Sequence, residues 1–323
     1  MYDSKKFHLN SHYIANCTSE PEYVKGEFWG HFFAAGFLVS LALIQYVAIL
    51  SRYFKAKFCP EYEFNGIVTR IAFPCNPRLS YTSYILPALI LYVVLAFSTH
   101  IKEEGGFLET LLFFIHGNPH TYNWLAFIFY IVVELLENYE SLHMPKYSSQ
   151  VAFAFTIMTM AGVAYTHLIV RCAYDTLLHS FFFYSAVVSS SSLIAQMSAP
   201  RSFFLAALVC FSTAMTGIWL VTLATLAYVY PQVNRVDWMS QTTAQKMQAI
   251  PTIFFFDATF LFFGMCALFF IFRAVRGKRA RANNWSFELV PRPDKADFRA
   301  SANNCFYEPL DRFDSETKIL EQP

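Results

Sequence analysis

Five ionisable side chains lie within apolar stretches of membrane-spanning length: His31, His167, Asp175, His179 and Asp257. Such groups are costly in a bilayer, so they mark functional sites or fully satisfied helix contacts. Neutral imidazole and carboxylate both bind metal ions, zinc among them, and together they relay protons. Three interpretations are open at this point: a structural hydrogen-bonding network, a ligand or proton site, and a hydrolytic metal centre.

The spacing of these groups adds local detail. Asp175 and His179 are four residues apart, which places them on one face of a helix. His167 and His179 flank a short turn, so we expect them on neighbouring antiparallel helices. No His-Glu-x-x-His or comparable spacing accompanies them, although zinc-dependent hydrolases of that type require it. We therefore assign no catalytic residue and no metal ligand from the sequence.

Two further carboxylates, Glu134 and Glu137, fall nearly one helical turn apart in a single apolar run. Both can face the same side of a helix. Glu137 is close enough to the end of the run to reach the membrane interface. Glu134 is deeper, and we expect it to meet a polar partner inside the helix bundle.

The elements that position these groups are set by the composition. The 323 residues are 55% apolar, 19% aromatic and 15% charged, whereas soluble domains are roughly 45–50% apolar and about 25% charged. This composition excludes an ordinary soluble globule and a disordered chain. The formal net charge of +1 gives no reason to expect a nucleic-acid partner. The expected partner is the lipid bilayer.

A hydrocarbon core of about 30 Å is crossed by about 20 helical residues. Seven apolar runs meet that length, and they predict an all-α, polytopic membrane helix bundle of about seven transmembrane helices. We expect a polar N-terminal segment at 1–27, the bundle at 28–275 and a disordered tail at 276–323. The runs are Phe28–Leu50, Tyr81–Thr99, Thr121–Tyr139, Tyr147–Val170, Tyr174–Met197, Ser202–Tyr230 and Ile250–Phe272.

Lysine and arginine are concentrated in alternate connections between the runs. The segment 51–79 and the beginning of the tail are rich in both residues, and such connections stay in the cytoplasm. The tail is therefore expected to be cytoplasmic and the N-terminus lumenal or extracellular. Asn16-Cys17-Thr18 is an N-glycosylation sequon in the expected outer segment. With this orientation, the five ionisable positions within the apolar runs all fall in the outer half of the bilayer, namely His31, His167, Asp175, His179 and Asp257.

The tail contains the tetrapeptide Tyr307-Glu308-Pro309-Leu310. A tyrosine followed by two residues and a bulky apolar side chain is the form that clathrin adaptors bind as an extended strand. Tyr307 and Leu310 are therefore a candidate sorting motif, with chance occurrence as the alternative. The expected location is the plasma membrane or an endosomal, lysosomal or Golgi membrane.

Three groups of residues resemble the transmembrane protein 45 family. Gly30-His31 is similar to the Gly-His start of that family's first span. His167, Asp175 and His179 follow its pattern of a His, an Asp eight residues later and a His four beyond. Arg201-Ser202 and Tyr230-Pro231 flank the sixth run as they do in the family. The similarity covers most of residues 28–275.

The resemblance implies an integral membrane protein of Golgi, endosomal, lysosomal or surface membranes, without an assigned reaction. The family often has a His pair opening its third span, where this chain has Tyr122, Asn123 and Trp124. A potential set of shared ligands is therefore incomplete here.

Three classes of function follow from these observations. The first is a non-enzymatic role in trafficking, scaffolding or small-ligand handling. The second is a lumenal-side, metal-dependent membrane hydrolase that uses the His/Asp cluster. The third is a transporter or receptor, but the chain has no inverted repeat, no Asp-Arg-Tyr-like triplet after the third run and no Asn-Pro-x-x-Tyr in the seventh. We therefore expect the first class.

Overall fold

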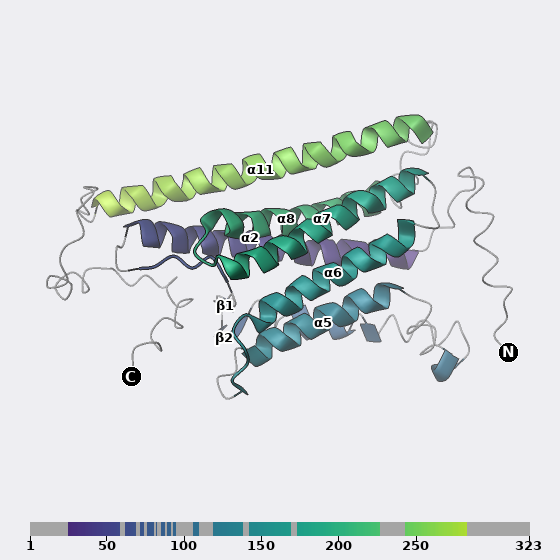
Figure 1. The fold of residues 1–323 in the computed structure, drawn as a ribbon, viewed down its shortest axis with the longest axis horizontal. Coiled ribbons are helices and arrows are strands. Elements are labelled where there is room, and N and C mark those ends of the chain that lie inside the picture. The colour runs from purple at the N-terminus through teal and green to yellow at the C-terminus, as the bar shows by residue number, and fades with distance from the viewer. Residues whose placement is uncertain are drawn as a thin grey trace.

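The protein is an elongated bundle of long helices (Figure 1). The computed structural model describes residues 25–58, 62–68, 72–73, 76–80, 82, 85–87, 89–91, 93–94, 106–109, 119–137, 142–168, 173–226 and 243–282. The long helices of this part are α2 (Lys25–Phe58), α5 (Pro119–Glu137), α6 (Ser148–Leu168), α7 (Ala173–Ser198), α8 (Phe203–Ala224) and α11 (Thr243–Ala282). Between α2 and α5, the described residues from 82 to 94 are also helical.

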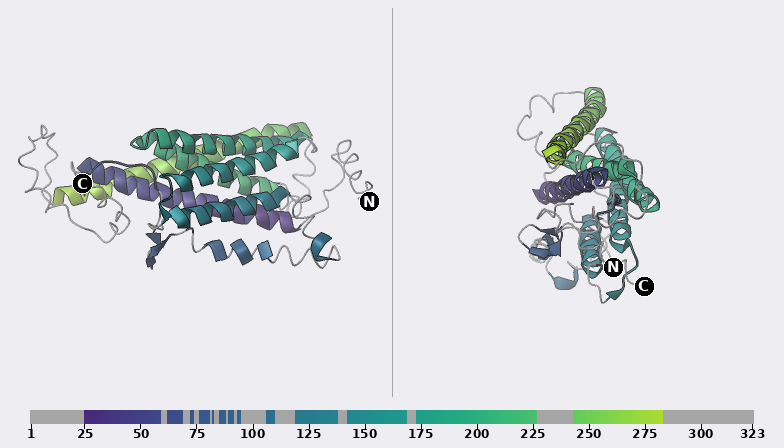
Figure 2. Two further views of the ribbon diagram at one scale, coloured as in Figure 1. Left: turned by 60° about the horizontal axis from the view of Figure 1, so that its bottom comes forward. Right: turned by 90° about the vertical axis from the view of Figure 1, so that its left-hand side faces the viewer.

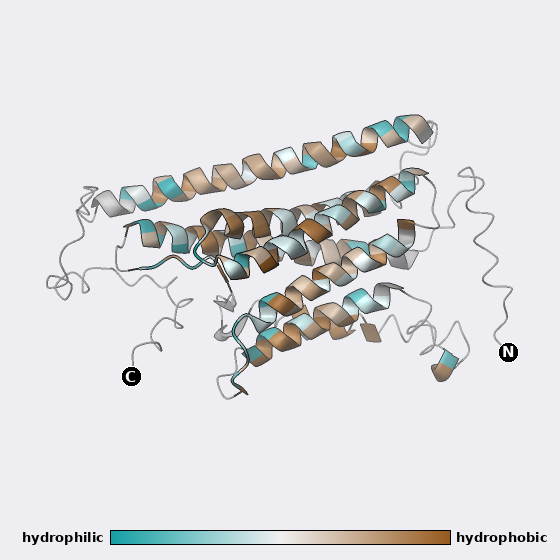
Figure 3. Cartoon of the chain, in the orientation of Figure 1, coloured by the Kyte–Doolittle hydropathy of each residue, from teal (hydrophilic) through white to brown (hydrophobic). Residues whose placement is uncertain are grey.

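Four of these helices are long and apolar enough to cross a membrane: α2, α7, α8 and α11, judged over the described residues. α5 and α6 have 19 and 21 residues, close to the roughly 20 that a bilayer core requires. Apolar residues cover the middle of the helices, and polar residues gather toward their ends (Figure 3). The chain is therefore a helical membrane protein.

Contacts between α5, α6, α7 and α8 show that each of these helices runs antiparallel to the next one. Between α7 and α8, Ser189 pairs with Thr213, while Leu178, earlier in α7, accepts a hydrogen bond from Trp219, later in α8. The same crossed order holds for α5 with α6 and for α6 with α7. Short connections favour this arrangement, since consecutive helices can then pack side by side.

α2 packs against α8 in the opposite direction and against α11 in the same direction. The Tyr46 hydroxyl of α2 donates to the Met265 carbonyl of α11 at 3.1 Å, and Arg276, further along α11, donates to Ser51, further along α2. A Cβ on Gly217 of α8 would lie 2.9 Å from the Ala35 carbonyl of α2. Glycine at this position lets the two backbones approach closely, as small residues do in membrane bundles.

α11 lies at the edge of the bundle (Figure 2). Only 11% of its apolar window is buried, compared with 44–61% for the windows of α2, α7 and α8. Its exposed surface is strongly aromatic, which suits contact with lipid tails. The rings concerned are Phe255, Phe256, Phe260, Phe262, Phe263 and Phe270.

The ends of α2 and α11 differ from the ends expected from hydropathy. α2 continues from Leu50 to Phe58, and α11 continues to Ala282. The predicted disordered tail at 276–323 therefore begins too early, because residues 276–282 are helical. At 1.5 Å per residue, α2 and α11 are about 51 and 60 Å long, which exceeds a core of about 30 Å. Asn16, Tyr307 and Leu310 lie outside the described residues.

A small antiparallel sheet adds to the predicted all-α class. β1 (Ala72–Phe73) pairs with β2 (Asn76–Ser80), with Ala72 opposite Ser80. The sheet lies between α2 and the helical residues 82–94 along the chain. Hydropathy did not indicate it, because β2 contains Pro77 and alternates too briefly to be recognised as a strand.

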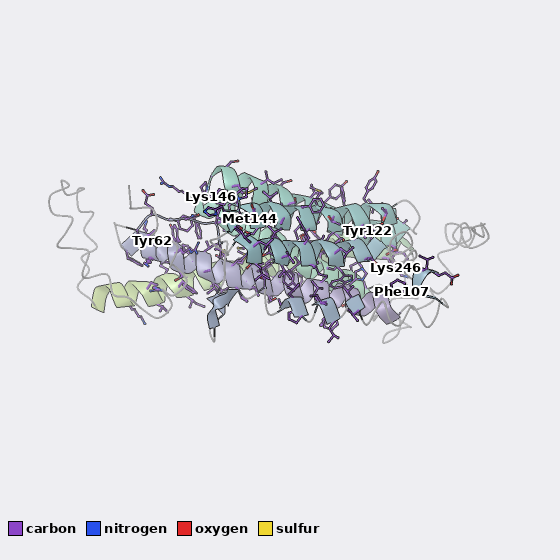
Figure 4. The ribbon with its side chains drawn as sticks, turned by 90° about the horizontal axis from the view of Figure 1, so that it is seen from below. Tyr62, Phe107, Tyr122, Met144, Lys146 and Lys246 are labelled. Atoms are coloured by element: carbon purple, nitrogen blue, oxygen red, sulfur yellow. The ribbon has the colours of Figure 1, made fainter. Side chains whose placement is uncertain are left out.

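The two ends of the bundle differ in charge. Of the Lys and Arg side chains that the structure describes, all except Lys246 lie at the end where α2 and α11 finish, which we call the basic end. Figure 4 shows Lys146 and Tyr62 at this end, with Lys246 and Tyr122 at the other. We call the half of the bundle nearer the basic end the basic half, and the other the distal half. The residues at the basic end are Arg52, Lys55, Lys57, Lys146, Arg201, Arg273, Arg276 and Lys278.

Candidate functional site

Asp175 and His179 form a pair within the first two turns of α7. His179 is 3% exposed, and its Nδ1 lies 2.9 Å from the Asp175 carbonyl oxygen and 3.2 Å from Asp175 Oδ1. Both contacts orient the imidazole ring along its own helix. Next to it, the buried Trp219 indole donates to the Leu178 carbonyl at 2.9 Å. The pair therefore sits against the α7–α8 interface.

Asp257 lies on α11 and makes a contact of a different kind. The Thr222 hydroxyl of α8 donates to Asp257 Oδ2 at 2.9 Å. Close by, the rings of Phe181, Trp219 and Phe254 pack together from three helices, with centroids 4.5–5.7 Å apart. The carboxylate thus ties the edge helix α11 to α8, beside an aromatic contact that joins α7, α8 and α11.

His31 is 8% exposed near the start of α2, which also belongs to the distal half. The side chain of His167 lies outside the described part of the chain. Among the described residues, no three His, Cys, Asp or Glu side chains are grouped so that they could hold one metal ion. The described contacts join Asp175 to His179 but connect Asp257 to Thr222.

The basic half contains a second set of polar contacts, around Glu134 on α5. Glu134 is 2% exposed, and its carboxylate accepts a hydrogen bond from the Thr82 hydroxyl. Tyr130, one turn earlier on α5, is also buried. The Thr82 hydroxyl is thus a polar partner of the kind that the depth of Glu134 requires.

Glu137 completes the end of α5. Its Oε2 accepts a hydrogen bond of 2.9 Å from the backbone N–H of Ser149, in the first turn of α6. The first N–H groups of a helix have no partner within the helix, and a carboxylate there also interacts favourably with the helix dipole. Glu137 therefore caps α6, while Glu134, one turn deeper, belongs to the interior.

A small cavity opens next to Tyr130. Its volume is about 20 Å³, which is room for one water molecule. Five helices and the segment 62–68 contribute to its wall, and the wall mixes amide, hydroxyl and thiol groups with apolar side chains. The polar lining side chains are Gln45, Tyr130, Ser149, Gln150, Gln196 and Cys210.

The segment 62–68 closes this end of the bundle. Gly66 donates its N–H to the Pro200 carbonyl at 2.8 Å and accepts a hydrogen bond from Gln196 Nε2 at 2.8 Å. A Cβ on Gly66 would lie 2.7 Å from Ala206 Cβ, so glycine allows the segment to pack directly on α8. Arg52 holds the next residue by donating to the Ile67 carbonyl at 2.7 Å.

Sequence reasoning singled out Glu134 and Glu137 but missed the glutamines of the cavity. Gln45, Gln150 and Gln196 each interrupt an apolar stretch, and that was the available signal. Amides are common in helix contacts and cost less in a membrane than charges, so three of them in different runs did not indicate a shared site. The helix directions bring them together.

No model of a known protein family matches the sequence. Curated protein sequences also give no match.

Proposed function

We propose that this chain is an integral membrane protein that crosses the bilayer seven times and serves in trafficking or scaffolding rather than catalysis. The observation that carries the seven crossings is the direction of the helices. α5 runs in the same direction as α2, as the alternation from α2 through α8, α7 and α6 to α5 requires. A chain that finishes α2 at one end and starts α5 at the other must return between them. The described helical residues between positions 82 and 94 belong to this part of the chain.

The charge difference between the two ends supports a cytoplasmic tail. Cytoplasmic connections of membrane proteins are enriched in Lys and Arg, and the basic end collects those residues from α2, α11 and two connections between helices. α11 finishes at that end, so the tail that follows it belongs to the cytoplasm. α2 starts at the distal end, so in this proposal the N-terminus, with Asn16, is lumenal or extracellular.

A non-enzymatic role agrees with the contacts in the distal half. The described contacts join Asp175 to His179 on one helix and Asp257 to Thr222 on a neighbouring helix. Contacts of this kind fix helices against one another. Similarity to the transmembrane protein 45 family, in the motifs around His31 and from His167 to His179, fits a protein of surface, endosomal, lysosomal or Golgi membranes.

A cytoplasmic tail would present Tyr307 and Leu310 to clathrin adaptors. Imaging of a tagged protein tests this part of the proposal directly. Tyr307→Ala and Leu310→Ala are each expected to shift a fluorescently tagged protein toward the cell surface. Glu308→Ala, at a position that such motifs leave variable, is the matched control and should leave the distribution unchanged. If both motif variants distribute like the parent protein, the trafficking role loses its support.

A further inference from the structure

We propose that the basic end binds an anionic phospholipid where α2 and α11 finish. Its phosphate contacts Lys57, Arg273 and Arg276, which we call the cation cluster, and its acyl chains lie along the exposed rings of Phe263 and Phe270. The basis is the placement of these basic and apolar side chains on two helices that contact each other. The assignment of the lipid to the cytoplasmic leaflet rests on the proposed orientation, whereas the binding itself does not.

α2 and α11 bring the cation cluster together. They finish side by side at the basic end (Figures 1 and 2). The rings of Phe54 on α2 and Phe269 on α11 pack together, with centroids 5.2 Å apart. Lys57 and Arg273 each come about one turn after one of these rings and on the same face of its helix. Because the two helices run in the same direction, both cations lie at the same level, beside the contact between the helices.

The third member of the cluster belongs to the same contact. Arg276 donates to the Ser51 hydroxyl of α2 at 3.2 Å, across the boundary between the two helices. Lys57 and Arg273 are exposed, so a ligand approaching from outside the bundle can reach both. The cluster is therefore held on rigid helices rather than on a connecting segment.

The two helices supply no carboxylate near this cluster. Each has one acidic residue, Glu27 on α2 and Asp257 on α11, and both lie in the distal half. In the neighbouring segment 62–68, Glu63 pairs with Arg201. Cations held close together repel one another, so a bound anion stabilises them. A phosphate suits this position because an Arg guanidinium binds it through two parallel N–H groups.

Arg273 lies at the depth where lipid phosphates are found. It directly follows the apolar run Ile250–Phe272, so it marks the end of the hydrocarbon core. A basic residue can also stabilise the negative end of a helix dipole, but that effect is confined to the last turn. Arg273 lies more than two turns before the end of α11 at Ala282. The dipole therefore does not account for its position.

Two exposed rings lead from the hydrocarbon core to Arg273. Phe270 comes three residues before Arg273, and Phe263 comes seven residues before Phe270, so the three side chains share one side of α11. Both rings are exposed. A free phosphate or an acidic peptide would leave the rings uncovered, whereas a phospholipid covers them with its acyl chains and brings its phosphate to the arginine. The combination favours a lipid.

Lys146 provides a matched control at the same end of the bundle. It is an exposed cation on the connection between α5 and α6, and Figure 4 shows it apart from the end of α11. Lys146→Gln and Lys57→Gln remove the same charge from the same end and differ in position. A general attraction of the basic end to anionic lipid predicts equal effects of the two substitutions. A site between α2 and α11 predicts an effect of Lys57→Gln alone.

The test is calorimetric titration of the full-length protein in neutral detergent with dioctanoyl phosphatidylinositol bisphosphate. The expected result is saturable binding that Lys57→Gln and Arg273→Gln each weaken roughly fivefold, while Lys146→Gln leaves it unchanged. Thermal unfolding of each variant without lipid checks that it is folded. Absence of saturable binding to the parent protein, or equal weakening by Lys146→Gln, would overturn the proposal.

Two further ligands test whether the acyl chains take part. Dioctanoyl phosphatidylcholine should not bind, and soluble inositol trisphosphate should bind more weakly than the lipid. Phe270→Ala should weaken binding of the lipid and leave binding of inositol trisphosphate unchanged. Phe256→Ala is its control, because this exposed ring lies about 25 Å along α11 from Arg273, too far for a dioctanoyl chain. Equal affinity for the lipid and for inositol trisphosphate would contradict a lipid site.

The leaflet is tested separately. Protease digestion of the tail in sealed vesicles reports the side on which α11 finishes. Digestion from the cytoplasmic side supports the assignment to the cytoplasmic leaflet. A lumenal tail would refute that assignment and the proposed orientation together, and the titration in detergent would still decide whether the lipid binds.

Discussion

The distal and basic halves of the bundle use buried polar groups in different ways. In the distal half, Asp175 contacts His179 on its own helix, and Asp257 contacts Thr222 on the neighbouring helix. In the basic half, side chains from five helices and one connecting segment meet around one cavity. Histidine and aspartate in a membrane span are the usual candidates for catalysis or metal binding. In this bundle, the polar side chains that several helices bring to the cavity are mainly amides and hydroxyls.

The difference shows that the type of a polar residue predicts its role less well than the set of helices that contribute to its contacts. The described contacts of Asp175 and His179 lie on one helix, whereas neutral groups from several helices enclose the cavity. Three experiments measure helix contacts in the two halves.

Gly217→Ala is expected to have the largest effect, because the added methyl group meets the α2 backbone. The Ala35 carbonyl oxygen would lie 2.9 Å from the new Cβ and Val39 Cγ2 would lie 2.8 Å from it. Overpacking of this kind costs about 1–3 kcal/mol. Thermal unfolding in detergent measures it. Gly36→Ala, on α2, is the control, since its Cβ would meet nothing within 4 Å; equal losses in the two variants would contradict a close α2–α8 contact.

Gln196→Leu should destabilise the basic half by about 1–2 kcal/mol, because it leaves the Gly66 carbonyl without its 2.8 Å hydrogen bond. The segment 62–68 should then be released from α7, and limited proteolysis at the basic end should cut it faster. Gln248→Leu, an exposed position on α11, is the comparison. An unchanged cleavage rate in Gln196→Leu would show that this amide does not hold the segment.

The Thr222–Asp257 contact should give the smallest effect. A double-mutant cycle with Thr222→Val and Asp257→Ala is expected to yield a coupling energy of about 0.6 kcal/mol, typical of hydrogen bonds between membrane helices. The unfolding free energies of the parent, the two single variants and the double variant supply the four corners of the cycle. A coupling above about 2 kcal/mol would mean that Asp257 has further partners and belongs to a larger site.

Hydropathy located the apolar centres of α2, α5, α6, α7, α8 and α11, because membrane-spanning helices require long apolar runs. It failed at the helix ends. Lys55 and Lys57 extend α2 beyond its apolar run, since lysine is a good helix former outside the membrane. Helix ends of this type depend on propensity and packing rather than on hydropathy.

The candidate site was predictable only in part, for a geometric reason. The Asp175–His179 contact follows from a spacing of four residues, which is local information. Glu134 meets Thr82 across 52 positions of the chain, and Gln196 meets Gly66 across 130. Such partners become visible only when the order and direction of the helices are known.

The orientation of the chain tests the central claim most directly. Tags at both ends of the full-length protein, probed by protease digestion of sealed membranes, report which side each end occupies. An odd number of crossings with a basic cytoplasmic end predicts that the C-terminal tag is digested from the cytoplasmic side and the N-terminal tag is protected. Digestion of both tags, or protection of both, would contradict the seven-crossing account.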